Sequence, residues 1–289
     1  MPKLANPLSP TTFLRRNAGK TIPLVAVIML AVMLIQCIIA LINSIPLSIR
    51  TIYRYTDSFL GVSPRLDPNI TPTLVRELTT KPPVAIDRVI LCRGSNAQVK
   101  SIVGKWPFGV MALEGKDFDY YMKRQGVTEI EGRKPEKGKP EIVISEPVAR
   151  NLKLKIGSVA LKPEDSDNFA REDVKVVGIA KTDRWLMITD KEFMASTQPI
   201  RIEFALIFTK DRTKQRQYDE WAIKKMKGKF AQLFAYHEIE KQAEEMFAVL
   251  YRIIDVVIGI LVVVICLLMG MLMNIYQSQR MVEYGLLQA

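Results

Sequence analysis

A short Gly-Lys-Thr stretch, Gly19-Lys20-Thr21, is the sequence element best suited to bind phosphate. In a nucleotide-binding loop, glycine amides cradle the phosphates, the lysine neutralises them, and the hydroxyl coordinates Mg²⁺. That loop also needs a glycine five residues before Gly19, and Leu14 stands there. The sequence before Leu14 has no strand pattern either. We therefore expect a basic flank here and no nucleotide-binding site.

Other residues that commonly do chemistry are few or scattered. His237 is the only histidine, so a histidine-based zinc site or catalytic triad within one chain is not expected. The three cysteines, Cys37, Cys92 and Cys266, offer no pair for a disulfide outside the cell, because two lie in apolar segments. The acidic residues form no recognisable catalytic pattern. We predict no catalytic residue, no metal site and no cofactor.

The formal net charge of +11 raises the question of a nucleic-acid partner. Basic residues alternate with acidic ones, as in Lys134, Glu136, Lys137, Lys139 and Glu141, and have no aromatic stacking partners among them. This pattern indicates a solvated, mildly basic surface and no nucleic-acid partner.

Two long apolar runs flank the middle segment of the chain, and they must position that segment. Ile22 to Ile42 contains Gln36 as its one strongly polar residue, and Val256 to Met273 contains no charge. About 20 apolar residues in a helix span a bilayer. Buried helices of a soluble core and, for the first run, a cleaved signal peptide are the alternatives. Asp255, beside the second run, can reach the headgroup region or serve a functional role.

Basic residues near the first run set the expected orientation. Lys3, Arg15, Arg16 and Lys20 precede it without any acidic residue, and such flanks remain cytoplasmic. Two spans then return the C-terminus to the cytoplasm and place residues 45–250 outside. The lead-in forms either a brief amphipathic helix on the inner surface or a tail.

Apolar residues at helical spacing continue past both runs, which predicts two stalk helices continuous with the spans. The residues expected to pack between these stalks, or against a second copy, are Ile49, Ile52, Phe59, Ile239, Met246, Phe247 and Leu250. Helix from Glu238 to Tyr276 would be roughly 60 Å long at about 1.5 Å per residue.

The segment between the stalks has the alternating patterns of an α+β domain. We expect strands over 87–91, 109–113, 141–145, 156–161, 173–180, 202–209 and 232–236, helices over 74–78, 117–124, 147–152 and 211–227, and a charged turn at 131–135. The expected organisation is a lead-in (1–20), a first transmembrane helix (21–44), an extracytoplasmic region (45–250), a second transmembrane helix (251–276) and a cytoplasmic segment (277–289).

The C-terminal segment carries a family resemblance. Arg280, Glu283, Tyr284, Gly285, Leu286 and Ala289 occupy the places of a motif in the first cytoplasmic loop of ABC transporter permeases of the FtsX/MacB/LolC type. A second resemblance covers Glu131-Gly132-Arg133, Glu141 to Ser145, Ala149, Leu152, Ile156-Gly157 and Val176 to Ala180, which are similar to an ordered run in that family's MacB-like periplasmic core domain. With the order of span, domain and span, the resemblance covers nearly the whole chain.

The resemblance implies a permease subunit in the cell membrane that pairs with a second permease copy or homologue and with a separate cytoplasmic ATPase. Arg280, Glu283, Tyr284, Gly285 and Leu286 would couple to that ATPase, and the outer domain would handle lipoprotein, peptide or drug-like substrates or contact an extracytoplasmic adaptor. Family members continue with two more spans, so a fragment or split product is expected. A two-span sensor receptor and a membrane-tethered enzyme are the competing classes.

Overall fold

The computed structural model describes residues 18–64, 71–101, 104–165, 168–197, 203–229 and 231–288. The chain divides into two compact units, residues 1–44 with 245–289 and residues 45–244.

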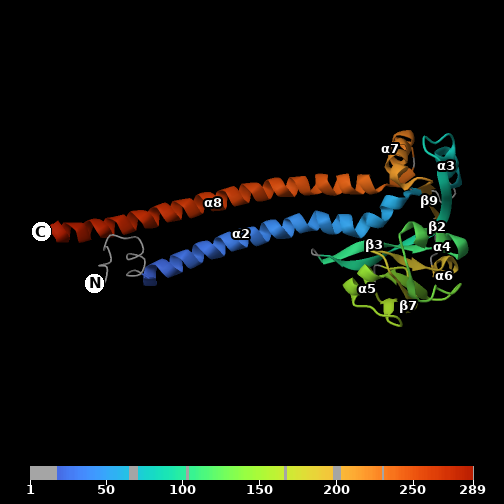
Figure 1. Cartoon of the computed structure of the whole chain (residues 1–289), viewed down its shortest axis with the longest axis horizontal. Coiled ribbons are helices and arrows are strands. Elements are labelled where there is room, and N and C mark those ends of the chain that lie inside the picture. The colour runs from blue at the N-terminus through green and yellow to red at the C-terminus, as the bar shows by residue number, and fades with distance from the viewer. Residues whose placement is uncertain are drawn as a thin grey trace, which may run out of the picture. The chain divides into compact units, whose positions relative to one another are not determined.

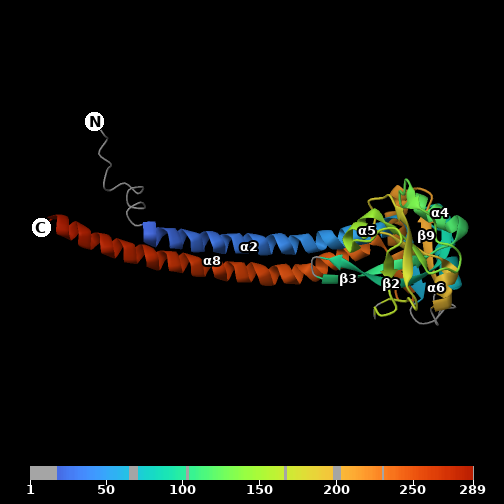
Figure 2. The same cartoon turned by 90° about the horizontal axis from the view of Figure 1, so that it is seen from below.

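The unit built from the two chain ends consists of apolar helix. Its described parts belong to α2 (Ala18–Tyr53) and α8 (Tyr236–Gln288), which are unbroken ribbons in Figure 1. Their apolar segments lie side by side, with the Tyr251 hydroxyl 3.5 Å from the carbonyl oxygen of Ile42 (Figure 2). Both helices are long and apolar enough to cross a membrane.

Large apolar side chains of this unit face outward. Val27, Met33, Ile260 and Met271 are each more than half exposed in the single chain, and the most apolar windows of both helices bury nothing. Exposed apolar surface of this extent requires lipid or a protein partner.

Residues 45–244 form an α+β unit around one mixed sheet, which confirms the expected mixture of elements. The strands are β1 (Leu60–Pro64), β2 (Ile86–Ser101), β3 (Gly104–Ala112), β4 (Ile130–Gly132), β5 (Glu141–Ser145), β6 (Val159–Leu161), β7 (Val174–Ala180), β8 (Met187–Thr189), β9 (Glu203–Thr209) and β10 (Ala231–Phe234). The shorter helices are η1 (Arg54–Ser58), α3 (Thr71–Thr79), α4 (Gly115–Arg124), α5 (Glu146–Leu152), α6 (Lys191–Thr197), η3 (Arg212–Lys214) and α7 (Gln215–Met226).

The strand order across the described part of the sheet is β10-β1-β9-β2-β3-β8-β5-β7-β4, with β6 beside β7. Most neighbours are antiparallel, whereas β3 with β8 and β5 with β7 are parallel. All five residues of β5 are buried, because β5 lies between β7 and β8 in the sheet and α5 contacts it.

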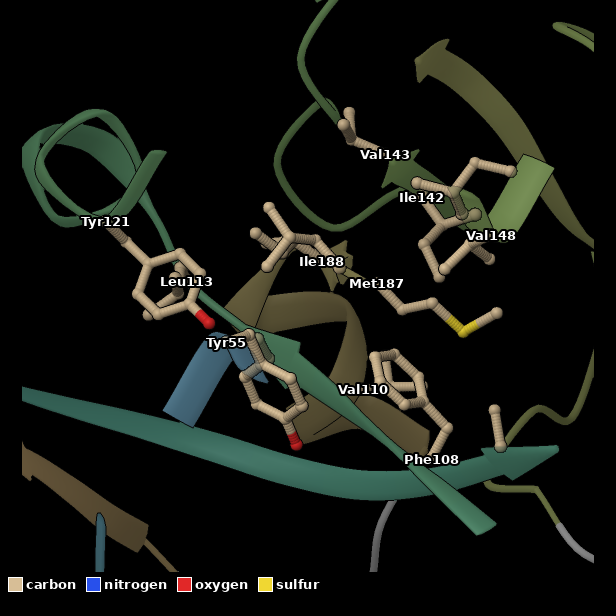
Figure 3. Close-up of a cluster of buried hydrophobic side chains, with 14 of the residues drawn as sticks. Tyr55, Phe108, Val110, Leu113, Tyr121, Ile142, Val143, Val148, Met187 and Ile188 are labelled. Carbon is tan, nitrogen blue, oxygen red and sulfur yellow. The ribbon is translucent and has the colours of Figure 1, made fainter. Parts of the chain in front are cut away.

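Two apolar clusters stabilise this unit. The larger one surrounds β5, β3 and α4, and Figure 3 shows Tyr55, Phe108, Met187 and Ile188 converging in it. The smaller cluster lies under α3 and α7, which are neighbours in Figure 1 and contribute Leu78 and Tyr218.

Three expectations about local structure were wrong or incomplete. The first stalk helix ends at Tyr53, because η1 and then extended backbone at Phe59 lead into β1, where we expected continued helix. Residues 130–132 form β4 where a turn was expected, since they pair with β7. Strand β8 and helix α6 had no counterpart in the sequence analysis.

Candidate functional site

The end of α2 is embedded in the domain by aromatic packing. Ile52, Tyr55 and Phe59 are almost fully buried in the larger apolar cluster. The Tyr55 ring meets Phe108 edge to face at 5.4 Å between centroids, and Phe59 meets Phe208 at 5.6 Å. Aromatic pairs at these distances stabilise beyond their buried area. Movement of the α2 terminus therefore requires movement of the domain core with it.

A buried ion pair fixes the same terminus. Arg184, between β7 and β8, donates from Nη2 to Asp57 Oδ2 at 2.8 Å and from Nη1 to Asp57 Oδ1. The Arg184 side chain is 5% exposed and that of Asp57 is 27% exposed. A two-pronged guanidinium–carboxylate pair has a fixed geometry as well as a favourable energy. It therefore sets the orientation of η1 on the domain.

Backbone carbonyls of η1, the helical turn that follows α2, are satisfied by the same group of residues. Arg184 Nη1 also donates to the carbonyl oxygen of Arg54 at 3.1 Å, and the buried amide of Gln125 donates to the carbonyl of Tyr55 at 3.0 Å. Gln125 Nε2 further donates to Ser58 Oγ at 2.9 Å. The last carbonyls of a helix have no partner within the helix. Here the domain supplies those partners, and Arg184 brings a positive charge that suits a helix C-terminus.

A second arginine, Arg212, also pairs with Asp57, so two positive groups face one negative group at this site. Arg212 Nη2 lies 3.1 Å from Asp57 Oδ1, so one carboxylate receives two guanidinium groups. Arg212 is 44% exposed, and solvent therefore screens its contribution. We call Asp57, Arg184, Arg212 and Gln125 the stalk junction.

The beginning of α8 is joined to α2 by charge. Arg50 on α2 pairs with Glu240 at 3.1 Å and with Glu244, which lies one helical turn further along α8. These side chains are at least one-third exposed, and such pairs contribute about 0–1 kcal/mol. Ala243, between the two glutamates, is buried. The pairing fixes register between the helices more than it stabilises them.

The predicted stalk residues have different outcomes. Ile49 and Ile52 are buried on α2, and Phe247 is buried on α8. Ile239 is half-buried. Phe59 is a correction, because the helix ends before it and its ring joins the domain core. The side chains of Met246 and Leu250 lie outside the described part, although their backbone belongs to α8.

The predicted coupling residues lie near the end of α8. Arg280, Glu283, Tyr284, Gly285 and Leu286 have helical backbone continuous with the second apolar run, while their side chains lie outside the described part. Their role stays a prediction. Gly19, Lys20 and Thr21 are in the first turns of α2, and residues 1–17, with the expected surface helix, lie outside the described residues.

The outer-domain motif has a structural explanation at β4 and β7. Gly132, at φ +93°, is paired with Gly178, and a Cβ at either position would come within 2.5 Å of the other strand's backbone. Arg133 forms a two-pronged pair with Glu141, with its Nη1 2.6 Å from Glu141 Oε2. This pair lowers the pKa of the Glu141 carboxyl. These motif residues therefore fix backbone geometry.

A cavity of about 440 Å³ lies beside the stalk junction within residues 45–244. Its walls come from the α2 end and η1 (Tyr53, Tyr55, Thr56, Phe59), from α8 (Ile239), and from strands β1, β2, β3, β9 and β10 (Gly61, Cys92, Arg93, Gly94, Ser95, Asn96, Pro107, Phe108, Gly109, Val110, Met111, Phe204, Leu206, Phe234). Cys92 is buried, and burial raises the pKa of its thiol to about 12, so it is not a reactive thiol. The cavity is mainly apolar and aromatic.

Sequence reasoning missed both the stalk junction and the cavity. Asp57 and Arg184 lie 127 positions apart, and neither stands in a recognisable motif. The cavity walls come from many separate elements. Within the described residues, no group of three or more His, Cys, Asp or Glu side chains could hold a metal ion.

Comparisons with known proteins give distant likenesses. No protein-family model matches the chain, and no curated protein does. Among solved structures, the periplasmic region of MacB from Actinobacillus actinomycetemcomitans aligns at 10% identity and a TM-score of 0.36, over 66% of this chain and 95% of that one. The extracellular domain of the ABC-type transporter YknZ from Gram-positive bacteria aligns at 12% identity and a TM-score of 0.35, over 61% of this chain and 99% of that one. At these TM-scores the likenesses carry no argument about this chain.

Proposed function

We propose that this chain is a permease subunit of an FtsX/MacB-type ABC transporter, and that it couples ATP hydrolysis by a separate cytoplasmic ATPase to movement of an extracytoplasmic domain. The observation that carries the proposal is the continuity of α2 and α8. Each helix runs without a break from an apolar, span-length segment into residues 45–244. A continuous helix is a stiff connector, so displacement at one end reaches the other.

Support for the direction of coupling comes from the two ends of these helices. The end of α2 is held by the stalk junction, which includes the buried Arg184–Asp57 pair. The far end of α8 carries the family-like motif with Arg280, Glu283 and Leu286. In this proposal the ATPase binds the α8 end, and the domain responds at the stalk junction. Residues 1–20 and 277–289 are then cytoplasmic, and residues 45–250 are outside.

The partners follow from the same proposal. A transporter of this kind needs a second permease copy or homologue, and the exposed apolar faces of α2 and α8 offer surface for it and for lipid. Substrates are lipoprotein, peptide or drug-like molecules handled outside the membrane.

The proposal is tested by ATPase association. Glu283 and Leu286 lie three residues apart and share a helix face. A buried apolar anchor contributes roughly 1.5–3 kcal/mol. Leu286→Asp should therefore weaken co-purification with the cognate ATPase by about 10-fold or more, and Glu283→Lys should also weaken it. The matched control is Met281→Asp, at an exposed position that is not one of the motif's specified residues.

Full association and transport in Leu286→Asp and Glu283→Lys would contradict the proposal. Retention of a histidine kinase or receptor adaptor in place of an ATPase would favour the sensor receptor instead.

A further inference from the structure

The cavity beside the stalk junction has an aromatic floor that depends on glycine. Gly61, Gly94 and Gly109 come from three different strands, and all line it. A Cβ at Gly94 would lie 3.2 Å from the Phe204 ring, and one at Gly109 would lie 3.0 Å from the Tyr55 hydroxyl. Absence of side chains at these positions lets the rings lie against the sheet. The result is an apolar surface that is open to a small molecule.

The volume fits a small ligand. Binding pockets for small molecules range from about 300 to 1,000 Å³ and combine apolar walls with a few polar groups. This cavity, at about 440 Å³, falls within that range. Its aromatic walls include Phe59, Phe108, Phe204 and Phe234.

Tyr55 supplies an unpaired polar group at the cavity wall. Tyr55 is only 6% exposed, and its hydroxyl makes no hydrogen bond within the described part of the chain. By contrast, the hydroxyl of neighbouring Tyr53 donates to the carbonyl of Pro107 at 3.0 Å and accepts from Trp106 at 3.1 Å. Buried tyrosine hydroxyls usually find a partner. The Tyr55 hydroxyl is therefore available for a ligand.

Charge at the cavity argues for a neutral ligand. Arg93 is the one charged residue among the described wall residues. Its Nη1 is fully enclosed and has no hydrogen-bond partner among them, so that atom does not face the open cavity. Ser95 and Asn96 add further neutral polar groups to the wall. The wall therefore offers mainly neutral polar groups to a ligand, and Arg93 as a whole is only 7% exposed.

We propose that this cavity binds a neutral amphiphile of the long-chain alcohol or ester class, with its apolar chain against the phenylalanine rings and its oxygen hydrogen-bonded to the Tyr55 hydroxyl. The site touches Tyr53 at the end of α2, Tyr55 in η1, and Ile239 at the start of α8. A bound ligand then contacts both the end of α2 and the start of α8. Binding itself is independent of the proposed transport function, and only its effect on the helices depends on that function.

Tryptophans near the cavity allow a direct test. Trp185 packs on the cavity residue Phe108 at 6.3 Å between centroids, whereas Trp221 packs on Tyr218 in the smaller cluster. Bromine quenches indole fluorescence on close approach. The probe is a bromine-terminated long-chain alkanol, added to the full chain in lipid nanodiscs. Two single-tryptophan variants, one retaining Trp185 and one retaining Trp221, are compared.

We expect saturable quenching of Trp185 and none of Trp221. Tyr55→Phe should weaken alkanol binding by about 10-fold, the value of one hydrogen bond, and should leave binding of the matching bromoalkane unchanged. Tyr120→Phe, which loses a hydroxyl outside the cavity, is the matched control. Because the Tyr55 hydroxyl has no described partner, Tyr55→Phe should keep the unfolding temperature of the parent chain.

Equal quenching of both tryptophans, or no saturable quenching, would overturn the site. Unchanged alkanol affinity in a folded Tyr55→Phe variant would overturn the role of the hydroxyl. A lower unfolding temperature for that variant would show that the hydroxyl has a structural partner and would also contradict the proposal.

Discussion

Arg184 and Asp57, 127 positions apart in the chain, form a two-pronged ion pair whose second contact is 2.8 Å long. One partner belongs to the domain and the other to the turn that ends α2. The pair joins the connector helix to the sheet at a nearly buried site. Within residues 45–244, it fixes the turn that follows α2 to the rest of the domain.

Loss of Arg184 should destabilise residues 45–244 strongly. Breaking a fully buried ion pair by removing one partner costs about 3–5 kcal/mol. Asp57 is 27% exposed and keeps Arg212 beside it after Arg184 is removed. Arg184→Ala should therefore lower the free energy of unfolding by an amount at the lower end of that range, about 3 kcal/mol, measured by denaturant titration of the full chain in detergent. Arg212→Ala removes the exposed arginine from the same carboxylate and should cost much less. Equal effects of the two substitutions would contradict the assignment of Arg184 as the main partner.

A buried carboxyl in α7 predicts a pH dependence of stability. Burial raises the pKa of Asp219 to about 7, against an ordinary value of 3.8. The folded state therefore binds the proton more tightly, and this group costs stability as pH rises from about 4 to about 7. The loss in free energy of unfolding is about 1.4 kcal/mol for each pH unit between the ordinary and the raised pKa. Asp219→Asn, which can still accept from Gln215, should equal the parent chain at pH 4 and exceed its stability at pH 8.

The control residue is Asp211, whose effect on stability should change with pH in the opposite direction. Hydrogen bonds from Thr213 lower the pKa of the exposed Asp211 carboxyl. Asp211→Asn should thus lose stability at pH 7 and none below the folded pKa of that carboxyl. Urea titrations at several pH values, followed by tryptophan fluorescence, measure both differences. A constant difference between parent and Asp219→Asn across this range would contradict the burial of an ionisable Asp219.

Membrane orientation is tested with introduced cysteines. Native Cys92 is unsuitable, because it is buried and its thiol pKa is raised. In a chain without native cysteines, Lys153→Cys, at an exposed position in the domain, should react with a membrane-impermeant maleimide in intact cells. Gln277→Cys should react only after permeabilisation. The reverse labelling pattern would contradict cytoplasmic termini.

The sequence predicted those elements whose pattern is local. Span-length apolar runs identify α2 and α8, and short runs rich in Val, Ile and Phe identify β5, β7 and β9. The end of α2 was missed because the helical spacing of Ile52, Thr56 and Phe59 suits either a continued helix or the domain core. Strand β8 was missed because its three residues pair with strands distant in the sequence. The stalk junction depends on contacts across the whole domain, which no local pattern contains.

Distance measurement between the helices tests the central claim of coupling most directly. Spin labels at Thr51 of α2 and Gln242 of α8, both exposed within residues 45–244, report the arrangement of the two helix roots by pulsed electron resonance. The transporter is assembled with its ATPase in nanodiscs and trapped with ATP and vanadate. Labels at Lys123 and Lys153, both exposed within the domain, serve as the control pair. The account predicts that nucleotide trapping shifts the 51–242 distance and leaves the 123–153 distance unchanged, whereas an unchanged 51–242 distance with an active, bound ATPase would contradict it.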